Sequence, residues 1–80
     1  MSKGPSIYRR LGIDVVTALP AQGPGWNLKL LRHDGSWSRP FEQLSHWSNR
    51  DEAEDAGREY LAQANRPTVM LLCTGRVVAQ

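Results

Sequence analysis

The sequence predicts an α+β fold, in which an antiparallel β-sheet of four to five strands carries one α-helix packed across it, in the order β-β-β-α-β-β. Three observations support this: a β-branched segment near the start, an Asp-Gly hairpin signal, and one helical stripe of small apolar residues. An 80-residue chain is too short to build two hydrophobic cores. We therefore expect a single domain over residues 13–80, preceded by a partly ordered tail over residues 1–12.

The first strand is predicted at Ile13–Leu19, which is rich in β-branched side chains. Pro20 ends it, and two prolines and two glycines in residues 20–25 predict a loop. Trp26–Arg32 then alternates as a strand does, and Asp34-Gly35 predicts a two-residue type I′ turn. That turn places the following side chains on the core face of the sheet: Trp26, Leu28, Leu30, Trp37 and Phe41.

The third strand is predicted at Trp37–Leu44, at an edge of the sheet or broken, because Pro40 cannot donate a ladder hydrogen bond. A helix follows, with Asn49 as its N-cap and Glu52 three residues later. Its apolar stripe consists of Ala53, Ala56, Gly57, Tyr60, Leu61 and Ala64. Such small residues require the helix to lie close to the sheet.

The last predicted strands are Thr68–Thr74, apolar on both faces, and Arg76–Ala79, joined through Gly75. Cys73 is expected to be a small buried hydrophobic side chain within the first of them. As the only cysteine, it cannot form an intramolecular disulfide, which suits a reducing compartment and favours a cytoplasmic location.

The composition argues against catalysis. One cysteine and two histidines do not complete a structural zinc site, and nothing in the sequence brings His33, His46 and Cys73 together. We expect no catalytic residues, cofactor or metal. No apolar segment of about 18 residues occurs, so no membrane partner is expected. The protein is expected to be a monomer or a weak homodimer.

The predicted helix is strongly acidic, with five of the eight carboxylates between Asp51 and Glu59. Acidic side chains in the first turn stabilise a helix, because they lie at the positive end of its dipole. This accounts for Asp51 and Glu52 without any partner. The other interpretation is an acidic face that docks on a basic groove, such as one that normally holds nucleic acid. The candidate partner-binding residues are Asp51, Glu54, Asp55, Glu59 and Trp47.

Trp47 lies outside both the strand alternation and the helical stripe. It either folds back as an anchor on the start of the helix or remains exposed for a partner. An alternative function is nucleic-acid binding on a basic, aromatic sheet face near Trp26 and Trp37. The candidates for that role are Arg9, Arg10, Lys29, Arg32 and Arg39.

Two resemblances bear on function. Four segments resemble the small DUF2188-like domains of bacteria: Trp26–Lys29, Asp34-Gly35, Asn49–Glu59 and Gly75–Val77. This resemblance implies a sheet-plus-helix fold and leaves the role of the domain unknown. The chain length, the arginine bias and the acidic helix also resemble small phage and prophage anti-CRISPR proteins. That resemblance implies a non-enzymatic inhibitor that binds a CRISPR effector complex, such as a type I-C Cascade, and blocks target DNA. The basic pair Arg9-Arg10 does not fit an inhibitor that simply imitates the negative charge of DNA.

Overall fold

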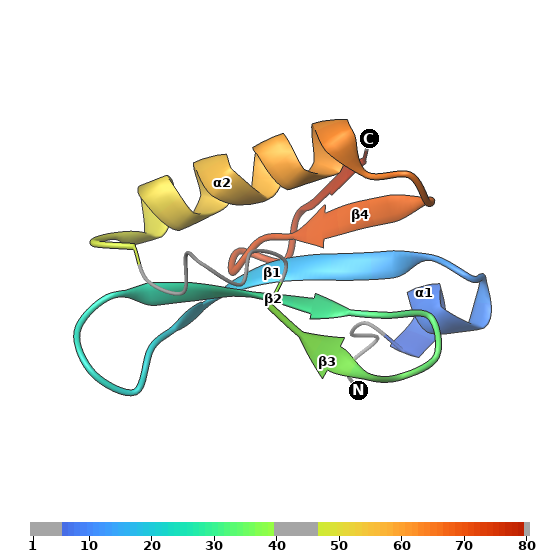
Figure 1. Cartoon of the computed structure of the whole chain (residues 1–80), viewed down its shortest axis with the longest axis horizontal. Coiled ribbons are helices and arrows are strands. Elements are labelled where there is room, and N and C mark those ends of the chain that lie inside the picture. The colour runs from blue at the N-terminus through green and yellow to red at the C-terminus, as the bar shows by residue number, and fades with distance from the viewer. Residues whose placement is uncertain (1–5, 40–46, 80) are drawn as a thin grey trace.

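Five strands form one sheet in the order β3-β2-β1-β4-β5, and the long helix α2 lies across one of its faces (Figure 1). The computed structural model describes residues 6–39 and 47–79. Its elements are α1 (Ser6–Arg10), β1 (Asp14–Pro20), β2 (Trp26–Leu31), β3 (Trp37–Ser38), α2 (Arg50–Gln63), β4 (Thr68–Leu71) and β5 (Val77–Ala79). The predicted α+β class and its order of strands around one main helix are confirmed.

The sheet is mixed, so the prediction of a purely antiparallel sheet was wrong. β1 is antiparallel to β2, but it runs parallel to β4, with Val16 opposite Met70. The reason is the return path through α2, because a connection that crosses over the sheet as a helix brings the next strand back in the same direction. β5 folds back on β4 and restores an antiparallel pair at that edge.

The turn between β2 and β3 also differs from the prediction. Gly35 has a φ of 93°, whereas the φ of Asp34 is not positive, so Asp34 does not meet the requirement of a type I′ turn. The N–H of Arg32 donates to the Ser36 carbonyl at 2.8 Å, which closes a three-residue loop. Asp34 Oδ1 accepts from the Ser36 N–H and hydroxyl at 2.9 and 2.7 Å, and these bonds lower the pKa of the Asp34 carboxyl.

The extra loop residue shifts the register by one position and moves Trp37 to the other face. Trp37 pairs with Leu31, and Ser38 pairs with Leu30. Since Leu30 faces α2, Trp37 lies on the face that α2 leaves uncovered, and 49% of its surface is exposed. The predicted core position of Trp37 was therefore wrong. Phe41 and the rest of the predicted third strand lie outside the described residues.

The turn between β4 and β5 repeats the same geometry. The Leu72 N–H donates to the Arg76 carbonyl at 2.8 Å, and Gly75 has a φ of 92°. β4 therefore ends at Leu71, and Cys73 lies in the turn with its side chain exposed. The expectation of a buried Cys73 was wrong, because the apolar pattern continues past the residue at which the chain turns.

The core lies between α2 and the sheet. Ala53, Gly57 and Leu61 are the buried residues of α2, which confirms the predicted stripe. A Cβ atom at Gly57 would lie 2.8 Å from Cε of Met70, so the glycine permits the close approach. The sheet side of this core consists of Val16, Ala18, Leu28, Leu30 and Met70.

The N-terminus of α2 is capped as predicted. Asn49 Oδ1 accepts a hydrogen bond from the Glu52 N–H at 2.9 Å, which satisfies one of the amide groups that the first helical turn leaves unpaired. Glu52 reaches back to the Ser48 N–H at 3.1 Å, one residue before the cap. This reciprocal pair fixes where the acidic helix begins.

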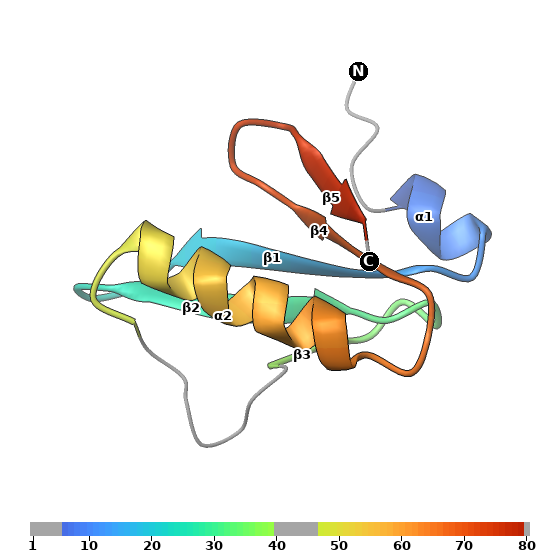
Figure 2. The same ribbon diagram turned by 90° about the horizontal axis from the view of Figure 1, so that it is seen from above.

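A short helix, α1, occupies part of the predicted tail. It lies near the start of β1, on the other side of the sheet from α2 (Figures 1 and 2). Its Arg9 side chain reaches the β2–β3 turn, where a Cβ at Gly35 would be 2.9 Å from Nη1 of Arg9. The uncovered face of the sheet thus has a basic helix beside it.

Candidate functional site

The outer side of α2 carries a line of carboxylates. Asp51, Asp55 and Glu59 are exposed and follow one another at four-residue intervals, so each lies about 6 Å further along the helix axis. Four-residue neighbours share a helix face. The structure thus brings three of the four predicted acidic residues together, and we call Asp51, Asp55 and Glu59 the acidic stripe.

Glu54, the fourth predicted acidic residue, is set apart from the stripe. Its side chain is only 12% exposed and lies 3.8 Å from Nε of Arg50. Arg50 also donates from Nη1 to the Cys73 sulfur at 3.1 Å, and this contact raises the pKa of Arg50. Arg50 is therefore held between the β4–β5 turn and Glu54, a carboxylate outside the acidic stripe.

One arginine does reach the acidic stripe. Nη1 of Arg58 lies 3.3 Å from Oδ1 of Asp55, with the two side chains 49% and 77% exposed. An exposed pair of this kind contributes little to stability and stays open to exchange with a partner's charges. α2 contains five carboxylates and two arginines, which gives it a net charge of −3. Because the net charge of the whole chain is +2, the residues outside α2 carry a net charge of +5.

Trp47 is tied to the sheet. Its backbone exchanges two 2.8 Å hydrogen bonds with Trp26, and its partly buried side chain packs against the core. Trp47 is thus anchored on β2, whereas the sequence left open an anchor on the start of the helix or an exposed position. The bridge fixes the chain just before the cap of α2.

The alternative basic candidates divide between the two sides of the sheet. Lys29 pairs with Thr17, one position away from Leu30, and so lies on the face that α2 leaves open. Trp37 is on that same face, followed two residues later by the exposed Arg39. Arg9 and Arg10 are exposed on α1, beside the same face. We call this set the basic face: Arg9, Arg10, Lys29, Trp37 and Arg39.

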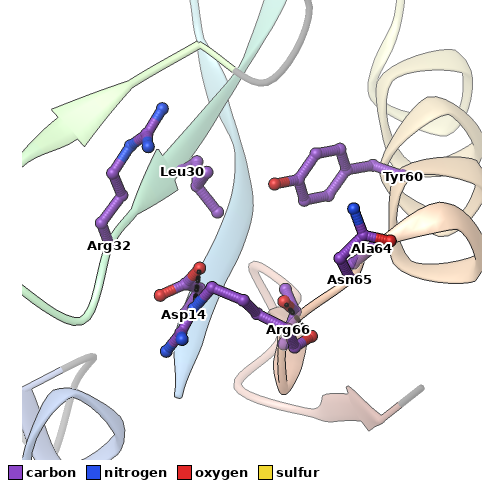
Figure 3. A pocket seen from close by; sticks show the side chains of 8 residues that line it. Asp14, Leu30, Arg32, Tyr60, Ala64, Asn65 and Arg66 are labelled. Carbon is purple, nitrogen blue, oxygen red and sulfur yellow. Dashed lines mark hydrogen bonds and ion pairs between the residues drawn. The ribbon is translucent and has the colours of Figure 1, made fainter. Parts of the chain in front are cut away.

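Arg32 does not belong to the basic face. It points to the side of the sheet that α2 covers, where it lines a pocket with Asp14 and Tyr60 (Figure 3). Burial raises the pKa of the Tyr60 hydroxyl, Asp14 acts in the same direction, and Arg32 opposes both.

Sequence reasoning missed Asp14, although its carboxyl group is the most connected one among the described residues. Only 8% of the side chain is exposed. Oδ1 accepts from the His33 N–H at 2.8 Å and lies 3.3 Å from His33 Nδ1, and Oδ2 accepts from Arg66 Nε at 3.4 Å. The available signal was the alternation, because Asp14 shares a strand face with the buried Val16 and Ala18.

Comparisons with known proteins add no functional information. The chain matches no protein-family model, and no curated protein or solved structure resembles it significantly. Within residues 6–39 and 47–79, no three His, Cys, Asp or Glu side chains are placed to hold a metal ion. Over the same residues, neither helix is long and apolar enough to cross a bilayer.

Proposed function

We propose that the protein is a non-enzymatic interaction module that docks the acidic stripe of α2 on a basic groove of a nucleic-acid-handling complex. The observation that carries this proposal is the alignment of Asp51, Asp55 and Glu59 on the exposed side of a helix whose core side is fixed by packing. The dipole explains acids in the first turn only, so it does not account for Asp55 and Glu59.

Charge density supports a groove that normally holds nucleic acid. The three carboxylates of the acidic stripe follow one another at intervals of about 6 Å along the helix axis, close to the span of two phosphates in one DNA strand. A DNA strand carries one phosphate per about 3.4 Å. The resemblance to anti-CRISPR proteins makes a type I-C CRISPR effector complex the first partner to test.

Reversing Asp55 and Glu59 to lysine should weaken binding to an immobilised type I-C Cascade by on the order of 100-fold or more. Like charges facing each other across an interface cost several kcal/mol, and each 1.4 kcal/mol is a factor of about ten in affinity. Both side chains are exposed, so circular dichroism and the melting temperature should stay unchanged. Biolayer interferometry measures the affinity.

Arg58→Glu provides a control of opposite sign on the same helix. Because Arg58 pairs with Asp55, its reversal adds negative charge to the acidic stripe and should strengthen binding. Unimpaired binding by the Asp55→Lys/Glu59→Lys protein would remove the acidic stripe from the interface. Failure of the wild type to bind would instead exclude Cascade as the partner.

Direct nucleic-acid binding is a second candidate, and the exposure of Trp37 between basic residues favours it. If the basic face binds, single-stranded DNA should shift in a gel at low salt, and Trp37→Ala should weaken that shift by about 5- to 150-fold, as expected for one lost base stack. The affinity should fall steeply as salt rises. The absence of a shift at low salt would eliminate this candidate.

A further inference from the structure

A small pocket lies between the start of β1, β2 and the end of α2, away from both the acidic stripe and the basic face (Figure 3). Its volume is about 200 Å³, and its polar lining comes from Asp14, Arg32, Tyr60, Asn65 and Arg66. Pockets for drug-sized ligands measure about 300–1,000 Å³. This pocket therefore has room for a small polar group and little more.

The negative charge in the pocket already has partners. Asp14 holds Arg66 through Oδ2 and the His33 N–H through Oδ1, as described above. Arg66 is held at a second point as well, since its Nη2 donates to the Gly12 carbonyl at 2.7 Å. These bonds fix Asp14 and Arg66 as a pair whose charges offset one another.

Arg32 supplies charge that this pair does not offset. Its Nε donates to the Ser38 hydroxyl, a neutral group, at 3.3 Å. In the part of the chain that the structure describes, its two terminal NH₂ groups have no hydrogen bond or ion pair. A guanidinium with both terminal groups available can donate two parallel hydrogen bonds to a carboxylate or a phosphate.

Tyr60 complements Arg32 from the helix side. Its hydroxyl points into the pocket toward β1 and β2 (Figure 3). Because burial raises the pKa of this hydroxyl above its ordinary value of 10.0, the group stays protonated at neutral pH and can act as a donor. The amide group of Asn65 borders the pocket from the end of α2 and can add a further donor.

We propose that this pocket binds a small oxyanion, the carboxylate or phosphate group of a small molecule, with Arg32 as its charged anchor and Tyr60 as a second donor. The side chain of Leu30 adds an apolar wall to the same pocket. This proposal is independent of the acidic stripe, because the two sites share no residue.

The test uses ¹H–¹⁵N NMR titration of the whole chain with inorganic phosphate and, separately, with acetate, at constant ionic strength in chloride. At least one anion should shift the amide signals around Arg32, Tyr60 and Asn65 with a saturable curve. Preference between the two probes distinguishes a phosphate from a carboxylate ligand. The absence of saturable shifts with both anions would overturn the proposal.

Matched variants separate a site from general positive charge. Arg32→Gln should weaken binding by about tenfold or more, as expected for the loss of a charged hydrogen-bonding group. Lys29→Gln removes the same charge from the opposite face and should leave binding unchanged, and Tyr60→Phe should weaken it by several-fold. Equal losses in Arg32→Gln and Lys29→Gln, or saturable binding of methylammonium in preference to both anions, would contradict the proposal.

Discussion

Replacing Leu28 by alanine is expected to lower the free energy of unfolding by about 2–5 kcal/mol, the range for large-to-small substitutions in a packed core. Leu28 is 1% exposed and belongs to the core between β2 and α2, where its Cδ2 would be 3.4 Å from a Cβ at Gly57. The neighbouring helix cannot collapse into the space easily, because Ala53 and Gly57 already bring it close to the sheet.

The size of the domain makes this effect decisive. At roughly 0.05–0.15 kcal/mol per residue, 80 residues give a total stability of about 4–12 kcal/mol. Urea unfolding monitored by circular dichroism should therefore show a large drop in midpoint for Leu28→Ala. Leu11→Ala is the matched control, since Leu11 is 69% exposed and should change stability by less than about 0.5 kcal/mol. Similar losses in the two variants would show that the core is not where the structure places it.

Replacing Asp14 by alanine is expected to cost about 2–4 kcal/mol, although Asp14 is a charged residue at the start of a strand. The substitution removes the acceptor of the partly buried His33 N–H and of Arg66 Nε, and hydrogen bonds to charged groups contribute more than neutral ones. It therefore loosens the β2–β3 turn and the α2–β4 connection from β1 at the same time.

Two further variants identify the cause. Asp14→Asn keeps a carbonyl oxygen for the His33 N–H and should recover part of the loss. Asp34→Ala removes a carboxylate whose bonds to Ser36 are exposed, so it should destabilise the protein much less than Asp14→Ala does. Equal destabilisation by Asp14→Ala and Asp34→Ala in thermal melts would contradict the role assigned to Asp14.

Local patterns in the sequence were sufficient to predict α2. Asn49 and Glu52 identify its start, and the small residues at helical spacing identify its buried side, because both signals arise from residues within one or two turns of each other. The acidic stripe could be predicted for the same reason, since residues four apart on a helix always share a face.

The position of Trp37 could not be predicted in this way. An Asp-Gly pair suits a two-residue loop, but it also suits a three-residue loop in which glycine alone takes the positive φ, as Gly35 does. The choice between them depends on what packs around the turn. A difference of one residue decides whether a tryptophan enters the core or faces outward.

The pocket around Asp14 depends on contacts that are distant in sequence. His33 lies 19 residues from Asp14, and Arg66 lies 52 residues away. No local pattern in the sequence predicts either contact, because the β2–β3 turn and the α2–β4 loop approach Asp14 only after the sheet has formed. The core-facing position of Asp14 in its strand indicates that the carboxyl group needs hydrogen-bonding partners, but it does not indicate which residues supply them.

The parallel pairing of β1 with β4 also determines how the chain folds. Thr17 and Leu71, joined across this pair by a 3.1 Å hydrogen bond, are 54 residues apart. The ends of a long segment must come together before these central contacts form, and the entropy of that closure slows folding relative to domains built from local contacts. β4 lies inside the sheet, between β1 and β5, and it follows α2 in the chain. Because α2 packs on β4 as well as on β1 and β2, we expect the acidic helix to be held firmly only after β4 has joined the sheet.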